Sequence, residues 1–159
     1  MTEYTRPATW DDVTRLARAL SDVGASYALI GGYALAAHGF NRFSEDIDLL
    51  IDPSPCNVEK ILAVLGELPD GAARELSPDE FSLHGPYAVR INDEFTIDLM
   101  PAACGHAWSE LAAFIETVDL DGVPLRVLSK RGLLLTKEGM RDKDKADALV
   151  LRRALGDKA

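Results

Sequence analysis

The chain is poor in cysteine and histidine, with two cysteines and three histidines among its 159 residues. Neither residue type forms a cluster with zinc-ligand spacing. We therefore interpret Cys56 and Cys104 as reduced thiols without a disulfide between them. His38, His84 and His106 are far apart in the sequence, so we expect structural rather than metal-ligating histidines.

Long apolar runs are also missing. No stretch approaches the roughly 20 apolar residues that a membrane span requires, and the N-terminus does not have the pattern of a secretory signal peptide. We expect a cytoplasmic protein that does not bind membranes. Its length and its 47% hydrophobic content are sufficient for one domain over residues 1–159. That domain would have a core at 26–128 and a helical C-terminal segment at 129–156.

Two common catalytic motifs do not occur in the sequence. A P-loop NTPase needs Gly-x-x-x-x-Gly-Lys-Ser/Thr, and an α/β-hydrolase needs the nucleophile elbow Gly-x-Ser-x-Gly. Their absence argues against both of these enzyme classes.

Positive charge is scarce except near the C-terminus. The net charge is −9, but residues 1–125 carry 7 Lys and Arg against 21 Asp and Glu, whereas residues 126–159 carry 10 against 5. An acidic body argues against binding to long DNA or other long nucleic acid. The basic C-terminal segment could hold a triphosphate or a short RNA end. A solvated basic helix face explains the same pattern, and charge alone leaves both interpretations open.

What the chain does contain is a concentrated polar motif at residues 30–51, IGGYALAAHGFNRFSEDIDLLI. Side chains alternate along a strand, so Asp46 and Asp48 point the same way while Ile47 points into the core. Two such carboxylates lie roughly 6–7 Å apart and can converge on a hard cation such as Mg²⁺. The alternative is a pair of solvated residues at a strand end.

Gly31 and Gly32 lie between the apolar run 27–30 and an alanine-rich segment. A Gly-Gly turn between strand and helix exposes backbone N–H groups and offers an anion site. Taken alone, it would more often be a simple turn. Beside two carboxylates, it predicts the phosphate side of a phosphoryl or nucleotidyl transfer site.

Asp98 lies within the apolar run 95–100, where an unpaired charge would be costly. On a strand next to Asp46 and Asp48, it would complete a site of three carboxylates. A strand aspartate turned to solvent remains the alternative.

The residues Gly31-Gly32, followed by Arg42-x-Ser44-x-Asp46-Ile47-Asp48, resemble the signature of the polymerase β-type nucleotidyltransferase superfamily. The resemblance is strongest over residues 27–52 and extends to the third carboxylate at Asp98. The chain is most similar to small bacterial members, namely minimal nucleotidyltransferases, abortive-infection-type toxins and short lincosamide-modifying enzymes.

The resemblance implies a nucleotidyltransferase fold that binds ATP or another NTP with two Mg²⁺ ions, or Mn²⁺ in their place. Asp46, Asp48 and Asp98 would be the metal ligands and catalytic residues, with Asp98 as general base. The expected nucleotide-binding residues share basic or small polar character and are Gly31, Gly32, Arg42, Ser44, Lys137 and Arg141. The role of Lys137 is inferred from the basic C-terminal helix of abortive-infection-type members, which this part of the chain resembles. The alternative is that Lys137 forms an ordinary charge pair on a surface helix. A cognate antitoxin is the protein partner that the resemblance implies.

The pattern along the chain predicts an α/β (α+β) fold, with a small mixed sheet, helices mainly on one face and a helical C-terminus closing the cleft. Helices are expected at 9–23, at 33–38, from Pro55, at 105–116 and from Ser129, and strands at 27–30, 46–51, 81–84, 87–91, 95–100 and 118–128, the last as a hairpin. Lys137 and Arg141 would share one helix face if Gly139 does not interrupt the helix.

Three functions compete on this evidence. The first is a toxin-like enzyme that nucleotidylates RNA, such as a tRNA 3′ end. The second is an enzyme that modifies a small hydroxyl compound such as an antibiotic. The third is a non-catalytic domain of the same fold that binds a nucleotide or a partner.

Overall fold

A six-stranded mixed sheet forms the centre of the molecule in the computed structural model, which describes residues 5–83, 88–137 and 142–156. The strand order is β3-β4-β2-β1-β8-β7. β1 runs antiparallel to β2 and parallel to β8, and β2 runs parallel to β4. The strands are β1 (Tyr27–Ile30), β2 (Asp46–Ile51), β3 (Val89–Asn92), β4 (Thr96–Met100), β7 (Ile115–Leu120) and β8 (Val123–Leu128). This mixed α/β architecture confirms the predicted fold class.

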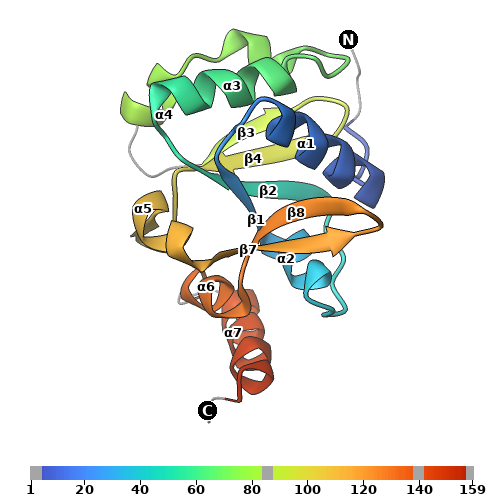
Figure 1. Ribbon diagram of the computed structural model, residues 1–159, viewed down its shortest axis with the longest axis vertical. Helices are drawn as coiled ribbons and strands as arrows, with labels where there is room; N and C mark the ends of the chain where they lie inside the picture. Colours follow the sequence, from blue (N-terminus) through green and yellow to red (C-terminus); the bar gives the residue numbers. More distant parts are fainter. Residues whose placement is uncertain (1–4, 84–87, 138–141, 157–159) are drawn as a thin grey trace.

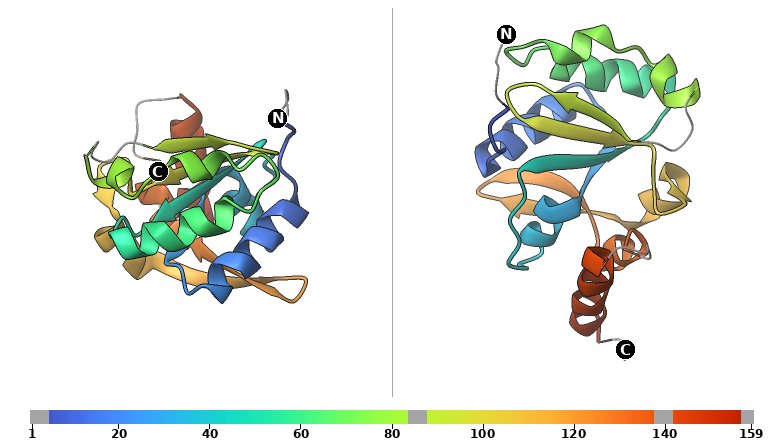
Figure 2. Two further views of the ribbon diagram at one scale, coloured as in Figure 1. Left: turned by 90° about the horizontal axis from the view of Figure 1, so that it is seen from above. Right: turned by 180° about the vertical axis from the view of Figure 1, so that it is seen from behind.

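The helices lie around this sheet in two groups. In Figure 1, α3 runs along the top with α1 beside it, whereas α6 and α7 extend downward to the C-terminus. The view from behind shows the same separation (Figure 2). The helices are α1 (Trp10–Asp22), α2 (Gly31–Ala37), α3 (Pro55–Leu65), α4 (Asp79–Leu83), α5 (Trp108–Leu111), α6 (Lys130–Leu135) and α7 (Asp142–Ala154), with 3₁₀ turns at Ala72–Glu75 and Ala112–Phe114.

The N-terminus of α1 forms as the sequence predicts. Thr9 and Asp12 make a reciprocal capping box, which satisfies backbone N–H groups that the first helical turn leaves without partners. Burial favours the neutral form of Asp12, but hydrogen bonds from Arg6, Arg15 and Thr9 outweigh it and hold its pKa well below the usual range. The ionised Asp12 thereby ties the segment before α1 to the helix itself.

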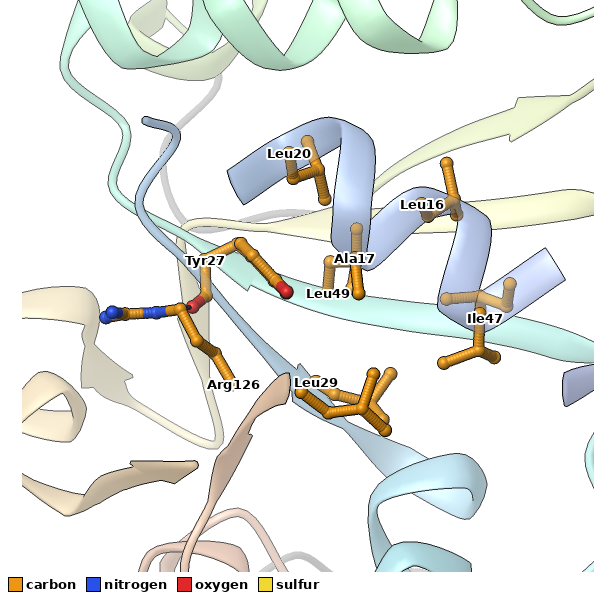
Figure 3. A pocket seen from close by; sticks show the side chains of 10 residues that line it. Leu16, Ala17, Leu20, Tyr27, Leu29, Ile47, Leu49 and Arg126 are labelled. Carbon is orange, nitrogen blue, oxygen red and sulfur yellow. Dashed lines mark hydrogen bonds between the residues drawn. The ribbon is translucent and has the colours of Figure 1, made fainter. Parts of the chain in front are cut away.

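The face of the sheet under α1 is apolar. Leu16, Ala17 and Leu20 of α1 lie over Ile47 and Leu49 of β2 (Figure 3). The void between these side chains is only about 10 Å³, which is about the size of one water probe, so it is part of the core packing rather than a ligand site. Because strand residues alternate, the polar residues of β2 must lie on the opposite face.

Two hairpins are built on turns with positive φ at both central residues. Asp121 and Gly122 (φ 49° and 85°) join β7 to β8, as the Asp-Gly sequence predicts. Cys104 and Gly105 (φ 51° and 81°) join the two-residue strands β5 (Ala102–Ala103) and β6 (His106–Ala107). The second hairpin was not predicted, because cysteine rarely adopts a left-handed conformation.

Three secondary-structure predictions are wrong. Residues 81–84 were expected to form a strand, but Phe81 is buried in the short helix α4, since a brief apolar run does not distinguish the two structures. The helix expected at 105–116 is limited to α5 and a 3₁₀ turn, because the β5–β6 hairpin occupies its first residues and β7 begins at Ile115.

The third correction concerns the C-terminal segment. Ser129 caps α6 as predicted, accepting a hydrogen bond from the N–H of Gly132. However, α6 ends at Leu135, so Lys137 lies in the following turn and not on the helix face that it was expected to share with Arg141 if Gly139 did not interrupt the helix. Arg141 lies outside the described residues.

Among the helices that are described, none has the length and apolar character needed to cross a membrane.

Candidate active site

A row of polar residues crosses three neighbouring strands on the face opposite α1. In the parallel β2–β4 pair, Asp48 is directly opposite Asp98, and in the antiparallel β3–β4 pair Asp98 is directly opposite Arg90. Asp46 lies two residues before Asp48 on β2 and therefore on the same face. The tertiary structure thus brings together all three carboxylates that the sequence singles out.

Asp48 and Asp98 lie in a largely buried environment. Burial, followed by the negative charge of Asp98 and a hydrogen bond with it, raises the pKa of Asp48 from 3.8 to about 7. Asp46 acts in the same direction, whereas the positive charge of Lys137 acts against the shift. Two carboxylates that resist simultaneous ionisation form a site that favours a shared proton or a bound cation.

The Gly31-Gly32 turn is packed directly against these carboxylates. Gly31 has φ +73°, and a Cβ at this position would clash with Oδ2 of Asp48 and lie 3.1 Å from its Cγ. A Cβ on Gly32 would lie 2.7 Å from Cβ of Ser44, whose hydroxyl donates a hydrogen bond to the carbonyl of Asp46. The two glycines are therefore needed for the close approach of the turn to β2.

Replacing Gly31 by alanine is expected to reduce the nucleotide transfer that the resemblance implies by about 100-fold, because the new methyl group would displace the Asp48 carboxylate. The matched control is Gly24→Ala, with φ +70° and no atom within 4 Å of the added Cβ. Both variants should lose about 1–2 kcal/mol of stability from the left-handed backbone, and Gly31→Ala should lose more because of its clash with Asp48. Steady-state kinetics and thermal melts measure the two effects, and equal activity in the two variants would contradict the role of the turn.

Arg90 is a site residue that the sequence analysis did not identify. Its Nε donates to Oδ1 of Asp98 at 2.9 Å, and its Nη2 donates to Oδ2 of Asp98 at 3.0 Å and to Oδ2 of Asp46 at 3.3 Å. The sequence Asn92-Asp93-Glu94, which is typical of a hairpin turn between two strands, contained the signal. Pairing Asn92 with Thr96 across this turn places Arg90 opposite Asp98.

The residues present fit a divalent cation in their chemistry, because aligned carboxylate oxygens are the ligands that Mg²⁺ prefers. Asp48 and Asp98 face each other, and the raised pKa of Asp48 indicates that their negative charges need compensation. Within residues 5–83, 88–137 and 142–156, however, no three His, Cys, Asp or Glu side chains are grouped as a ready metal site. In the structure, Asp46 and Asp98 form ion pairs with Arg90.

The predicted phosphate ligands Arg42 and Lys137 converge on a single carboxylate of α7. Asp147 is only 1% exposed and forms an ion pair with Arg42, while Nζ of Lys137 lies 3.2 Å from its Oδ2. Lys137 is also 3.6 Å from Oδ1 of Asp144. This cluster links the segment before β2 to the C-terminal helix. Phosphate binding by Arg42 and Lys137 stays a prediction.

A cavity of about 230 Å³ joins the separate parts of the site. Its lining includes Gly31, Asp48 and Lys137, together with residues 102–104 of the β5–β6 hairpin. The cavity therefore connects the glycine turn, one strand carboxylate and a lysine, which is the arrangement that a phosphate-bearing ligand beside a metal site would need.

Several solved structures share the fold of this chain. A candidate nucleotidyltransferase of Thermotoga maritima superposes with a TM-score of 0.60 at 13% identity, over 94% of this chain and 93% of that one. An antigenic nucleotidyltransferase-like protein of Paracoccidioides brasiliensis gives 0.55 at 17% identity, over 93% and 78%. The antibiotic-resistance factor ANT(2″)-Ia gives 0.54 at 18% identity, over 90% and 84%. At these identities the likeness shows the fold alone.

No curated protein matches the sequence. A family match does exist, to the nucleotidyl transferase AbiEii toxin of type IV toxin–antitoxin systems, and it covers residues 15–100. This region is more than half of the chain and contains the glycine turn, both aspartates of β2, Arg90 and Asp98. The resemblance to abortive-infection-type members is therefore confirmed, and the chain belongs to the AbiEii nucleotidyltransferase toxin family.

Proposed function

We propose that this nucleotidyltransferase moves a nucleoside monophosphate from an NTP to a hydroxyl group of RNA, with release of pyrophosphate. The observation that carries the proposal is the direct opposition of Asp48 and Asp98 on parallel strands, packed against the Gly31 turn. Nucleotidyl transfer needs carboxylates that hold a divalent cation next to a phosphate-binding region, because the cation stabilises the negative charge of the reacting phosphoryl group.

Asp46, Asp48 and Asp98 would hold Mg²⁺, which supplies charge stabilisation for the attacking and leaving oxygens. In our proposal Asp98 also accepts the proton of the acceptor hydroxyl, as the third of the three carboxylates. The backbone N–H groups of residues 31 and 32 and the ammonium group of Lys137 bind the triphosphate. Ser44 packs closely against Gly32 and thereby supports the turn.

An RNA acceptor is favoured by the charge distribution. The otherwise acidic chain exposes Lys145, Arg152 and Arg153 on α7, and this basic surface can attract phosphates of a short RNA end. Family membership supports a toxin role with a cognate antitoxin as partner, and we propose that the protein acts in the cytoplasm.

A small hydroxyl compound is the second candidate acceptor. The specific observation in its favour is the shared fold with the antibiotic-resistance factor ANT(2″)-Ia over most of both chains. The acidic body is also compatible with a small cationic substrate.

The decisive experiment incubates the purified protein with each of the four α-labelled NTPs and Mg²⁺, in parallel with total RNA and with a panel of small hydroxyl compounds. We expect label in tRNA-sized RNA, its loss in Asp48→Asn, and growth arrest on expression that Asp48→Ala relieves. Label confined to small compounds would replace the first acceptor by the second. Binding of ATP without Mg²⁺ and without turnover would instead support the non-catalytic alternative.

A further inference from the structure

The guanidinium group of Arg90 occupies the space between two predicted metal ligands. It holds both oxygens of Asp98 in a bidentate arrangement, at 2.9 and 3.0 Å, and reaches Asp46 at 3.3 Å. Bidentate arginine–carboxylate pairs are the strongest and geometrically most specific of such contacts. The arrangement satisfies the oxygen atoms that a divalent cation would otherwise coordinate.

Position and exposure set Arg90 apart from the other charged residues of the site. It is on β3 at the edge of the sheet, and its side chain is 58% exposed, whereas the Asp98 side chain is 10% exposed. The arginine can therefore rotate toward solvent without disturbing the core. The carboxylates, fixed on two central strands, cannot move away from each other in the same way.

We propose that Arg90 is an internal counter-ion that holds Asp46 and Asp98 together in the metal-free protein and competes with the divalent cation for their oxygens. The inference rests on the proposed function, because it takes the same carboxylates to be the ligands of the cation. Metal binding then releases Arg90 from Asp98 and Asp46. Arg90 thereby sets the concentration of divalent cation at which Asp46 and Asp98 bind it.

The test measures metal affinity rather than catalysis. Isothermal titration of EDTA-treated protein with MnCl₂ at low salt, without nucleotide, compares the wild type with Arg90→Gln and Arg90→Lys. Removing the competing charge is expected to tighten the Kd for Mn²⁺ by about tenfold in Arg90→Gln. Arg90→Lys keeps the charge but loses the bidentate geometry, so its affinity should be intermediate. The matched control is Arg18→Gln, an exposed arginine on α1, which should bind Mn²⁺ as the wild type does.

A second readout follows from the same competition. Without metal, Arg90→Gln leaves the carboxylates uncompensated, so its melting temperature should fall below that of the wild type, and saturating Mn²⁺ should remove the difference. An unchanged or weaker Mn²⁺ affinity in Arg90→Gln overturns the inference. If the wild type nevertheless transfers nucleotides, the proposed function survives that result. If neither protein binds Mn²⁺ at millimolar concentration, the cation site and the metal-dependent function fail together.

Discussion

Replacing Asp48 by asparagine is expected to abolish nucleotide transfer, lowering kcat/KM by about 1,000-fold or more, because a neutral amide cannot supply the negative charge that holds the cation. Asp48 lies at the middle of the site, opposite Asp98 and against the Gly31 turn. The measurement is transfer of label from an α-labelled NTP at saturating Mg²⁺.

The same substitution should stabilise the metal-free protein at alkaline pH. Burial and the charge of Asp98 raise the pKa of Asp48 from 3.8 to about 7 in the folded state, so the folded protein holds this proton more tightly than the unfolded chain. The contribution of protonated Asp48 to the free energy of unfolding is therefore fully present below about pH 4, and it is lost as the pH rises toward and through 7. Asparagine does not ionise, and at pH 8 in EDTA it should be more stable by an amount on the order of 3 kcal/mol.

Thermal melts between pH 4 and pH 8, with EDTA and with Mg²⁺, separate these effects. Asp121→Asn is the control, because Asp121 lies exposed in the β7–β8 turn, where asparagine tolerates the positive φ equally well. A melting temperature for Asp48→Asn that falls below that of the wild type at pH 8 in EDTA would contradict the burial argument. Retention of more than a tenth of the activity would contradict the catalytic role.

Replacing Asp147 by alanine is expected to destabilise the protein by about 3–5 kcal/mol, the usual cost of removing one partner from a buried ion cluster. Asp147 is almost fully buried between Arg42 and Lys137, and Lys137 is itself only 8% exposed. The variant leaves two cations near each other without their main counter-charge. At 2–4 °C or so per kcal/mol for a chain of this size, the melting temperature should fall by roughly 10 °C.

A paired variant distinguishes charge from packing. Asp147→Leu combined with Lys137→Met replaces an ion pair by apolar side chains, so it should recover much of the lost stability while leaving transfer impaired, since Lys137 is the predicted phosphate ligand. Glu59→Ala, at an exposed position on α3, is the control and should change neither quantity. If Asp147→Ala melts within about 1 °C of the wild type, the cluster does not hold α7 in place.

The link through Asp147 also changes the interpretation of the two basic residues. From the sequence, Arg42 and Lys137 are simply positive charges near a phosphate site. In the structure they share a carboxylate from a helix more than 90 residues away from Arg42 in the chain. Binding of a triphosphate at this point would therefore be coupled to the position of α7, which the hydrogen exchange of α7 amides with and without NTP would report.

Much of the fold could be predicted because its signals are local. The start of the first helix at Thr9, the period-two pattern of Asp46 and Asp48, and the Asp121-Gly122 turn each depend on a few neighbouring residues, and each is present as expected. Such signals fix the ends of elements and the faces of strands directly. The same signals fail where short apolar runs permit two structures, as at residues 81–84, or where a non-glycine residue adopts positive φ, as at Cys104.

The sequence by itself was enough to predict the reaction class, because its glycine turn, Asp-x-Asp strand and later strand aspartate resemble the signature of one nucleotidyltransferase superfamily. Only the tertiary structure decided which charges neutralise one another. Strand pairing places Arg90 beside Asp98, and the docking of α7 places Asp147 beside Arg42 and Lys137. The physical reason is that the strength of a charge pair depends on distance and burial, and those quantities are set by contacts between segments far apart in the chain.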